Sequence, residues 1–545
     1  MAFDIKRINS IIIVMMENRS FDHMLGYLGL SNNGINGIRG DAPWSERYTN
    51  RCDGSQPCAP FHLQGQLALT DDPPHETTDI AKQIGAAYPY PGNQAPMNGF
   101  MQSYAQTGVA VDKRREVMGY YTDAEAPITG FFAEKFVICD RWFACLPTST
   151  QPNRLMAMAG YSLIDNTFHD VIPNHRLVYE WLEERRNLLD WRVYHEGFPF
   201  FMLMPTWSYR ILKDAVFEEK FRRLDDLEDD LHADPTGAEV FFVEPKYTSD
   251  PLRTMVPSDD HSPSSIAGGQ SFLRKIYCAL KKNKSRWNRS LMIVIYDENG
   301  GFFDHESPLP IHTNPPPGAS WSIPSFATTG IRVPGMLISP LLKSGVLSEP
   351  LDHTSVLKFL AERFDNGHYS DAVTNRDGVE SLRVALDRLG LDAARTEDLE
   401  PPVYDIDQST KDLAMEQVKR RRSTELDKAF EAALLQVRDK YPDDAAKKFP
   451  ELKDFLRNPL WLNVEDQIRR EGMSIYEIDF LLEDCVKSGE IKLLAEPGRR
   501  NEAVSNLAVF VQRLIDDTRA RGERSIDRPT FFNAKGALQP LWPFL

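Results

Sequence analysis

The chain is poor in cysteine, and its cysteines are not spaced to bind a metal through thiolates. Only six occur in 545 residues, far below the density of a small disulfide-stabilised fold. No CxxC pair is present, so a thiolate zinc site is not expected. Cys52 and Cys58 flank a turn-rich loop, where a short disulfide and two free thiols are both open alternatives. The other cysteines lie in apolar or helical contexts and are expected to be buried thiols: Cys139, Cys145, Cys278 and Cys485.

Long apolar runs are also missing. The run Ile11–Met16 near the N-terminus has six residues, too few for the core of a signal peptide and far too few to cross a bilayer. We therefore expect a soluble chain with no transmembrane segment and no Sec-type signal. Three locations stay open: the cytoplasm, a secreted or periplasmic site if the chain is a mature form, and export by a signal-independent route.

Basic residues are in deficit. Lysine and arginine number 63 against 79 aspartates and glutamates, which gives a net charge of −16. A general nucleic-acid binder needs a basic face, so no nucleic-acid partner is expected. The composition is otherwise that of a globular protein, with 42% hydrophobic and 26% charged residues. The excess of carboxylates raises the question of whether some of them bind a cation.

Short apolar runs alternate with amphipathic segments over the first 400 residues. These runs are continuous rather than alternating, which is typical of strands buried on both faces of a mostly parallel sheet. Helical patterns lie between them, so the sequence predicts an α/β domain over 1–400 with helices flanking a central sheet. The predicted strands are Ile11–Met16, Phe136–Cys139, Val240–Val243, Leu291–Tyr296 and Met336–Ile338; the clearest helices are Gln270–Lys282 and Thr354–Arg363; and Thr313–Ala319 and Pro89–Gly99 are predicted loops.

The composition changes near the Pro401-Pro402 turn. The following residues are dense in Glu, Lys, Arg, Leu and Ala with helical periodicity, which predicts a separate, mainly helical C-terminal region over 401–545. Lys419–Arg422 is a basic run in this region, read either as a solvated helix face or as a patch for phosphate or lipid headgroups. The predicted helices are Asp412–Tyr441, Asn463–Glu471, Ser474–Lys487 and Glu502–Arg521.

Two predicted strands run directly into carboxylates and an amide. Glu17 and Asn18 follow the first strand, and Asp297 and Glu298 follow the strand that ends at residue 296. Ligands of open α/β sheets bind beyond the carboxyl ends of the strands. Neighbouring acids at such a position repel one another unless a cation neutralises them, and their oxygens suit a hard divalent metal. The alternative is that Asn18, like the asparagine after Glu298, only caps a helix.

Hydroxyl side chains follow a third predicted strand. Thr148, Ser149 and Thr150 precede Pro152 and an apolar helical stretch. Hydroxyls at a helix start serve either as an N-cap or, beside a metal, as a nucleophile. Arg154 in the same segment is expected to contact phosphate. Four histidines in polar, loop-like contexts are further candidates for phosphate contacts or proton transfer: His75, His195, His261 and His353.

Four motifs together carry a resemblance to a known family. They are Met16–His23 (MENRSFDH), Pro152-Asn153-Arg154 with its upstream hydroxyl, Asp259-Asp260-His261, and Asp297–His305 (DENGGFFDH). In this order, over roughly residues 5–370, they resemble the bacterial phosphoesterase family. That family comprises phospholipases C and acid phosphatases of the alkaline phosphatase superfamily.

The resemblance implies an alkaline phosphatase-like fold and a site built around one divalent metal ion, with calcium, zinc, magnesium and manganese all open. The metal ligands fall on Glu17, Asn18, Asp297, Glu298 and Thr150. Thr150 is also the implied nucleophile, although Gln151 stands where relatives commonly have Trp. The substrate phosphate would meet Asn153 and Arg154, and the implied histidines are His75, His195 and His261.

The resemblance also implies a mechanism and a substrate class. Thr150 would attack phosphorus and form a phosphothreonine, and His261 would protonate the leaving alcohol. The substrate is a phosphate ester, with a phospholipid headgroup as one candidate, and either phospholipase C or acid phosphatase activity is expected. Two alternatives stay open: a sulfatase or phosphonate hydrolase of the same superfamily, and a non-catalytic effector or binding module that uses the C-terminal helices. No oligomeric state is predicted.

Overall fold

The centre of the molecule is an eight-stranded sheet. The computed structural model describes residues 3–85, 94–235, 237–250, 256–420 and 424–450. In these residues the strand order is β11-β4-β10-β9-β1-β8-β6-β7. The strands are β1 (Ser10–Met16), β4 (Val137–Cys139), β6 (Leu189–His195), β7 (Phe221–Arg223), β8 (Ala238–Glu244), β9 (Ser290–Tyr296), β10 (Gly335–Ile338) and β11 (Gly345–Leu347).

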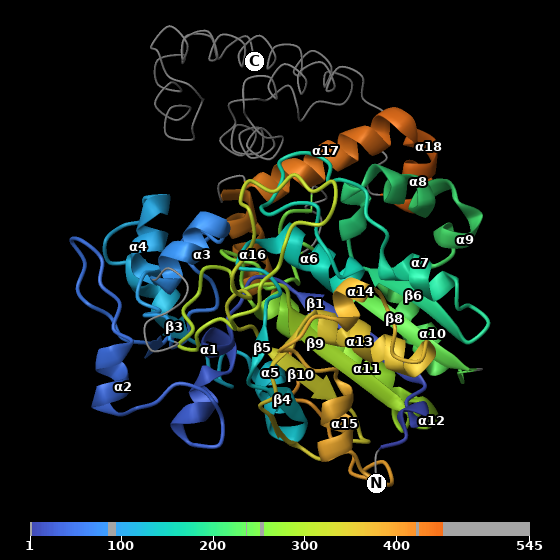
Figure 1. Cartoon of the computed structure of the whole chain (residues 1–545), viewed down its shortest axis with the longest axis horizontal. Coiled ribbons are helices and arrows are strands. Elements are labelled where there is room, and N and C mark those ends of the chain that lie inside the picture. Colours follow the sequence, from blue (N-terminus) through green and yellow to red (C-terminus); the bar gives the residue numbers. More distant parts are fainter. Residues whose placement is uncertain (1–2, 86–93, 236, 251–255, 421–423, 451–545) are drawn as a thin grey trace, which may run out of the picture.

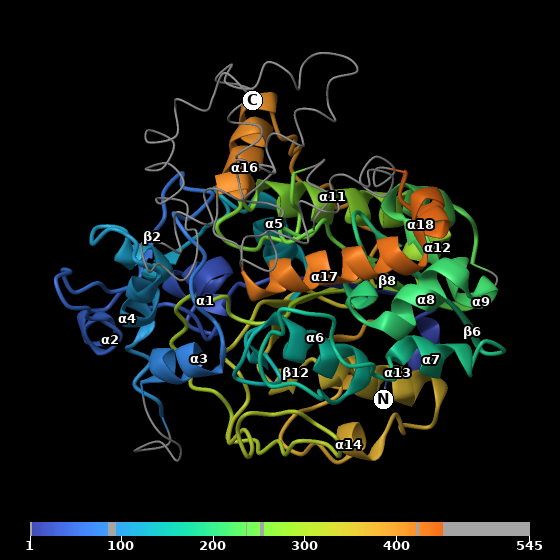
Figure 2. The ribbon, with the colours of Figure 1, turned by 90° about the horizontal axis from the view of Figure 1, so that it is seen from above.

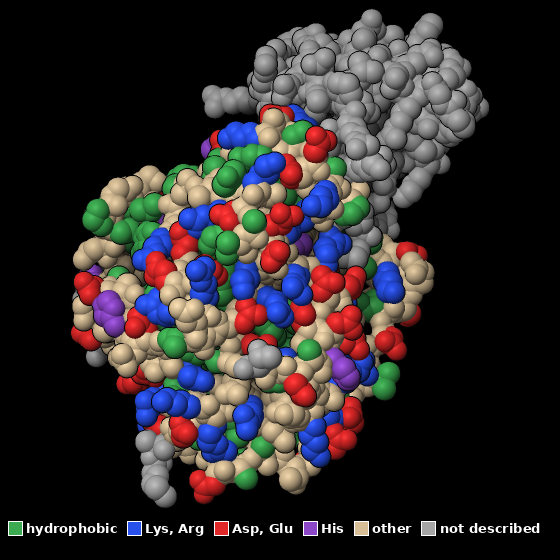
Figure 3. All heavy atoms as spheres, turned by 90° about the vertical axis from the view of Figure 1, so that its right-hand side faces the viewer, with side chains coloured by type: hydrophobic (Ala, Val, Ile, Leu, Met, Phe, Trp, Pro, Cys, Tyr) green, Lys and Arg blue, Asp and Glu red, His purple; other side chains and the backbone are tan. Residues whose placement is uncertain are grey.

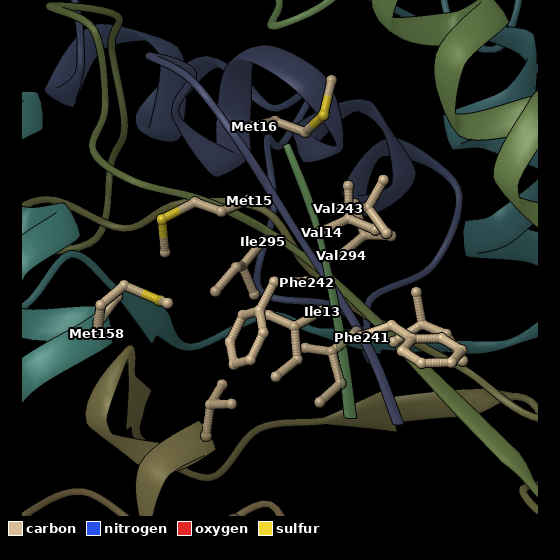
Figure 4. Close-up of a cluster of buried hydrophobic side chains, with 14 of the residues drawn as sticks. Ile13, Val14, Met15, Met16, Met158, Phe241, Phe242, Val243, Val294 and Ile295 are labelled. Carbon is tan, nitrogen blue, oxygen red and sulfur yellow. The ribbon is translucent and has the colours of Figure 1, made fainter. Parts of the chain in front are cut away.

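The sheet is mostly parallel. β9, β1, β8, β6 and β7 pair in parallel, as do β4 and β11, whereas β10 runs antiparallel to both of its neighbours. Every residue of β1 and β9 is buried, which explains their unbroken apolar sequences. Figure 4 shows their side chains, among them Ile13, Val14 and Ile295, packed with Met158 and Phe242 in the core.

All five predicted strands are present, and the α/β prediction is confirmed. Three strands of the sheet were missed. β6 reads Leu-Asp-Trp-Arg-Val-Tyr-His, in which polar residues interrupt the apolar ones, and β7 and β11 have only three residues each. Strands this short or this polar carry little periodic signal, so their pairing with longer neighbours decides their conformation.

Helices cover both faces of the sheet (Figures 1 and 2). α5 (Pro127–Lys135) and α11 (Ala267–Lys282) lie on one side, and α6 (Thr150–Ala159) and α13 (Thr354–Phe364) on the other. α11 and α13 confirm the two helices predicted for this domain, and Thr313–Ala319 is a loop as predicted. Of the predicted loop Pro89–Gly99, residues 89–93 lie outside the described part of the chain.

The remaining elements are short. The other α-helices of this region are α1 (Phe21–Met24), α2 (Ala42–Arg47), α3 (Thr77–Ile84), α4 (Phe100–Tyr104), α7 (Val178–Glu183), α8 (Pro205–Lys213), α9 (Ala215–Glu218), α10 (Leu227–His232), α12 (Lys284–Trp287), α14 (Asp371–Thr374) and α15 (Arg383–Leu389). Two small parallel pairs lie outside the main sheet: β2 (Phe61–His62) with β3 (Gly119–Tyr120), and β5 (Trp142–Phe143) with β12 (Leu351–Asp352).

The C-terminal region is helical where the structure describes it, but its first helix is divided. Instead of one helix over Asp412–Tyr441, the chain forms α16 (Gln408–Arg420), α17 (Glu425–Lys440) and α18 (Pro442–Lys448). A new helix begins at Thr424 because its side chain accepts a hydrogen bond from the backbone N–H of Asp427, while Asp427 caps in return. The predicted helices beyond residue 450 and the side chains of Lys419–Arg422 lie outside the described residues.

α17 packs onto the α/β domain. Phe430 contacts the rings of Phe198, Phe200 and Tyr247, with centroids 5.6–6.2 Å apart. These aromatic residues follow the carboxyl ends of β6 and β8. The helix therefore shares one hydrophobic core with the sheet and lies across the edge at which the strands end (Figure 1).

Several expectations about the surface and the thiols can be compared with the structure. Cys52 and Cys58 are free thiols, which decides against the disulfide. Among the described residues, no helix is both long and apolar enough to span a bilayer. Acidic and basic side chains are interspersed over the face shown in Figure 3.

Candidate active site

The tips of two neighbouring strands form the floor of the candidate site. β1 and β9 pair in register with Met16 opposite Tyr296, so the residues that follow them emerge side by side. The backbone N–H of Asn18 donates to Asp297 Oδ1 at 2.9 Å, and Glu17, Asn18, Asp297 and Glu298 are all buried. The structure thus brings the four predicted strand-tip ligands together, as parallel strand ends at one sheet edge require.

The backbones of Asn18 and Gly300 approach each other closely at the floor of the site. Asn18 has φ +57° and Gly300 has φ +59°. A Cβ at Gly300 would lie 2.1 Å from the carbonyl oxygen of Asn18. Only glycine fits at this position, because a side chain would both strain the backbone and push Asn18 away.

Thr150 is the hydroxyl that reaches the strand tips. Its Oγ1 donates to Asn18 Oδ1 at 3.2 Å. The two preceding hydroxyls have other partners: Thr148 donates to the carbonyl of Asp165 at 2.5 Å, and Ser149 donates to Glu76 Oε2 at 2.8 Å. Of the three hydroxyls that the sequence offers, the structure therefore brings Thr150 to the cluster.

Asn153 holds the loop in front of Thr150. Its amide donates to the carbonyls of Leu146, Thr148 and Ser149 at 2.8–3.1 Å, and its Oδ1 accepts the N–H of Leu146 at 2.9 Å. These bonds occupy the side chain. The predicted contact of Asn153 with substrate phosphate has no support in this arrangement, and its visible role is to shape the loop.

Arg154 lies beneath the floor. It is buried, with Nε 3.1 Å from Glu17 Oε1 and Nη1 3.1 Å from the Tyr247 hydroxyl. Nη2 donates to the carbonyls of Met15 and Met16, the last residues of β1. With these partners, Arg154 neutralises Glu17 from below, so the predicted phosphate contact has no support here either.

Two of the predicted histidines lie at the site. His261 is buried between two carboxylates, with Nδ1 2.9 Å from Glu17 Oε2 and Nε2 3.1 Å from Asp72 Oδ2. The side-chain amide of Asn18 lies 3.2 Å from His261 Nε2 and 3.3 Å from His75 Nε2. Asn18 thus lies between the threonine hydroxyl on one side and both histidines on the other.

The electrostatics favour protonated histidines. Burial alone would lower the pKa of His75, but the carboxylates of Glu298 and Asp72 raise it to about 9. Burial opposes the charge of His261 as well, yet Asp72 and Glu17 raise its pKa well above the usual value. A site with two positive imidazoles suits an anionic substrate.

The carboxylates at the β9 tip are only partly neutralised: Arg154 Nε lies 3.6 Å from Asp297 Oδ2, and His75 Nε2 lies 4.0 Å from Glu298 Oε1. Burial raises the pKa of Glu298 to about 8, and burial together with Glu17 raises that of Asp297 to about 6. For Glu17, Arg154 outweighs the effect of burial with the help of His261, and its pKa is lowered. Asp297 Oδ2 and Glu298 Oε1 are buried, and neither accepts a hydrogen bond from a described residue.

These atoms fit a divalent cation. Buried carboxylate oxygens without a hydrogen bond are costly unless a positive charge faces them. Two overlapping groups at the site have ligand atoms close enough to share an ion: Glu17 with Asp259 and His261, and Asp72 with His75 and His261. Neither group includes Asp297 or Glu298, and a histidine in them would bind the ion only in its neutral form. The protein therefore has acidic and histidine groups able to bind metal at this edge of the sheet.

His195 lies elsewhere. It is the last residue of β6, its Nδ1 lies 2.7 Å from the carbonyl of Gly197, and its ring contacts Phe449. The described residues show no contact between His195 and Thr150, Asn18 or the carboxylates. Its predicted role toward the same phosphate stays a prediction without support from the geometry.

Three further residues support the site: His353 was among the four candidate histidines, Asp259 lies in one of the four motifs, and Asp72 was not predicted. Asp72 faces His261, and Asp259 accepts the backbone N–H of His261 at 3.1 Å. His353 Nε2 lies 2.6 Å from the carbonyl oxygen of Asp297 and holds the β9 tip. The only sequence signal for Asp72 was its place three residues before the predicted His75, whereas Asp259 belongs to the Asp259-Asp260-His261 motif.

The ends of the two long motifs form a separate buried network. Asp22 pairs with His305 at 2.6 Å and with Arg332 at 2.9 Å, and Arg332 also pairs with Asp304. Asp22, Asp304 and His305 could by spacing share an ion. Arg332 already supplies a positive charge there, so this network ties the two motifs together structurally.

Comparison with known proteins agrees with this geometry. A sequence profile of the Phosphoesterase family matches residues 8–366. The chain is 32% identical to non-specific phospholipase C3 of Arabidopsis thaliana, covering 68% of this chain and 74% of that protein. It is 29% identical to phospholipase C A of Mycobacterium tuberculosis, covering 66% and 73%, and 26% identical to the non-hemolytic phospholipase C of Pseudomonas aeruginosa, covering 66% and 54%.

Solved structures match more distantly. A phosphonate monoester hydrolase from Silicibacter pomeroyi aligns with a TM-score of 0.26 and 11% identity, covering 51% of this chain and 77% of that one. An alkaline phosphatase superfamily protein from Vibrio parahaemolyticus aligns at 0.27 and 10%, covering 58% and 82%. Scores this low carry no argument, and the assignment depends on the sequence relatives and the profile. The chain belongs to the Phosphoesterase family and is a phosphoester hydrolase.

Proposed function

We propose that this chain is a metal-dependent phosphoester hydrolase of the phospholipase C type that acts through a phosphothreonine at Thr150. The observation that carries the proposal is the placement of the Thr150 hydroxyl 3.2 Å from Asn18 Oδ1, directly beside the buried carboxylates of the two strand tips. The relatives named above support the substrate class, since each of them bears the name of a phospholipase C.

Glu17, Asn18, Asp297, Glu298 and Thr150 are the residues that would hold one divalent cation. Asp297 Oδ2 and Glu298 Oε1, which are buried and accept no hydrogen bond from a described residue, support this assignment. Bound there, a divalent cation would supply the positive charge that lowers the pKa of the Thr150 hydroxyl and balances the negative charge of the phosphodiester.

Thr150 performs the first chemical step. Its Oγ1 loses its proton to solvent and forms a bond to phosphorus while the bond from phosphorus to the ester oxygen breaks. The hydrogen bond to Asn18 orients this oxygen before attack. Water then cleaves the phosphothreonine, which restores the hydroxyl and releases the phosphate product.

His261 and His75 handle charge and protons. His261 is held by Glu17 and Asp72 and is the group that protonates the departing alcohol. His75, fixed by a 2.7 Å contact between its Nδ1 and the carbonyl of Pro73, presents Nε2 to the nonbridging oxygens. Neither role requires Arg154, which lies beneath the floor and holds Glu17 in place through a hydrogen bond.

A substrate panel with metal control tests the proposal. Purified protein is assayed with para-nitrophenyl phosphorylcholine as the diester and para-nitrophenyl phosphate as the monoester, before and after chelation. We expect hydrolysis of the diester, loss of activity with chelator, and recovery when a divalent ion is restored. A faster monoester reaction would instead favour a phosphatase, and full activity in the chelated protein would rule out metal dependence.

Glu298→Gln provides the matched variant. It removes one charge from the cluster while keeping the size of the side chain, so we expect weaker metal binding and a raised metal requirement. Glu397→Gln, at an exposed carboxylate, is the control and should behave like the parent. If both variants need the same metal concentration for half-maximal activity, Glu298 is not a metal ligand.

A further inference from the structure

A second polar cavity lies at the same edge of the sheet, at the ends of β6 and β7. Its volume is about 840 Å³, and its lining includes His195, which ends β6, and Arg223, which ends β7. The two residues are direct partners across the strand pair. Among the described residues, the lining does not include Glu17, Asn18, Thr150 or the β9 carboxylates, so this cavity is distinct from the candidate active site.

Basic side chains predominate in this cavity. Arg222, Arg223, Lys447 and Lys448 line it, against three carboxylates. Lys447 and Lys448 come from the end of α18, which packs against α8 beside this edge of the sheet (Figures 1 and 2). Lys448 is directed inward, because its Nζ donates to the backbone carbonyl of Glu218 at 2.8 Å. Two of these cations already face carboxylates, since Arg222 pairs with Asp230 at 2.9 Å and Lys447 Nζ lies 3.7 Å from Glu218 Oε1. The concentration of basic groups is nevertheless a local feature in a chain with a net charge of −16.

His195 gives the cavity an unpaired polar atom. The residue is 1% exposed, and its Nδ1 lies 2.7 Å from the carbonyl oxygen of Gly197. Nδ1 therefore carries the hydrogen and donates it. Nε2 is buried and has no hydrogen-bond partner among the described residues. A buried ring nitrogen without a partner is rare in a folded protein and indicates a missing ligand group.

The electrostatics of the cavity disfavour the charged forms of His195 and Lys448. Burial, with the charges of Lys448 and Arg223, lowers the pKa of His195 to about 3 against the opposing effect of its hydrogen bond to Gly197. Burial also lowers the pKa of Lys448 to about 8. Both groups would regain their usual protonation if a negative charge entered the cavity.

We propose that the cavity between β6, β7 and α18 binds a phosphate group, carried by free phosphate or by a small phosphorylated alcohol. Monohydrogen phosphate offers oxygens that accept from Lys448 and the neighbouring cations, and it also offers one P–OH that can donate to His195 Nε2. A phosphorylated alcohol lacks this P–OH when fully ionised, and then binds as His195 takes up a proton. The site is separate from the proposed chemistry at Thr150 and does not depend on it.

Nuclear magnetic resonance of the full chain, with labelled histidine, tests this proposal. The His195 ring resonance is assigned by its absence in His195→Gln. Inorganic phosphate and glycerol 3-phosphate are titrated separately at neutral pH, and a saturable shift of the His195 resonance is expected with at least one of them. The titration that shifts the His195 resonance identifies whether free phosphate or a phosphorylated alcohol supplies the phosphate group. No shift with either probe would overturn the proposal, and this result needs only the unmodified protein.

Sulfate and a double variant sharpen the test. Sulfate has the shape of phosphate but no O–H at neutral pH, so it should bind roughly fivefold more weakly than inorganic phosphate, the effect of one hydrogen bond. Lys447→Gln combined with Lys448→Gln should remove the shift of His195 while hydrolysis of para-nitrophenyl phosphorylcholine stays unchanged. Lys440→Gln, at an exposed lysine of α17, is the control and should keep the shift. An unaltered shift in the double variant would overturn the assignment of the cavity.

Discussion

The hydroxyl of Thr150 donates a hydrogen bond to Asn18 across 132 positions of the chain, with 3.2 Å between the two oxygens. One residue begins a helix and the other follows a buried strand. The contact forms because the loop before α6 ends above the tip of β1. Through Asn18, the same hydroxyl is connected to His75, His261 and the carboxylates of β9.

Replacing Thr150 should abolish catalysis and leave the fold intact. In Thr150→Ala we expect kcat for para-nitrophenyl phosphorylcholine to fall by at least about 10³-fold, since removal of a nucleophile eliminates the covalent path. Thr150→Ser should keep measurable activity. Ser149→Ala is the control, because its hydroxyl is directed at Glu76. Loss of activity in Ser149→Ala alone would transfer the nucleophile assignment to that hydroxyl.

Replacing Arg154 should affect stability before it affects substrate binding. Arg154→Met removes the guanidinium from the buried Glu17 and leaves only His261 facing it, and breaking such a buried pair costs about 3–5 kcal/mol of unfolding free energy. Arg176→Met removes an exposed pair with Glu184 and should cost less than about 1 kcal/mol. Denaturant unfolding measures both. A raised KM at unchanged stability in Arg154→Met would show a direct phosphate contact instead.

Two glycine substitutions separate backbone strain from steric clash. Gly54 and Gly300 both have positive φ, but a Cβ at Gly54 meets nothing within 4 Å, whereas one at Gly300 lies 2.1 Å from the Asn18 carbonyl. Gly54→Ala should cost about 1 kcal/mol of unfolding free energy. Gly300→Ala should cost at least about 3 kcal/mol and reduce turnover by displacing Asn18. Equal losses in urea unfolding would show that the loop relaxes around the added methyl group.

Stability should fall in mild acid because of His175. Burial lowers its pKa to about 4, against the weaker effect of a hydrogen bond to Pro173, and its Nε2 accepts the N–H of Leu163 at 2.9 Å. An unfolded histidine titrates near 6.5. Because the folded pKa is the lower one, the stabilising contribution is complete above about 6.5 and is lost as the pH falls toward about 4, to a total of about 2–3 kcal/mol.

His175→Gln checks this pH dependence. Glutamine can still accept from Leu163 but takes up no proton, so the unfolding free energy of the variant should fall less steeply between pH 6.5 and 4. The measurement is denaturant unfolding at several pH values. Parallel curves for the parent and the variant would contradict the assignment.

The four strand-tip ligands show how much of the site can be predicted from local sequence patterns. The unbroken apolar runs before Glu17 and Asp297 identify buried parallel strands, and parallel strands end at one edge of their sheet. That reasoning already places the four ligands near one another. It does not identify Asp72 or Asp259, because their roles depend on where two loops cross the sheet edge rather than on any local pattern.

Arg154 and His195 show the opposite case. Arg154 lies near the start of α6 and His195 ends β6, and the sequence around each residue does not distinguish a ligand from a support. Packing decides between these roles: Arg154 lies beneath Glu17, and His195 faces a cavity two strands away from β1.

By itself, the sequence determined the α/β architecture, the pair of acidic strand tips and the hydroxyl-rich loop, because periodicity and adjacency along the chain encode these features. Tertiary structure alone decided which hydroxyl meets Asn18, which histidines share the site, and which charged groups lie beneath it. Contacts of this kind join residues more than 100 positions apart, and no local pattern carries that information.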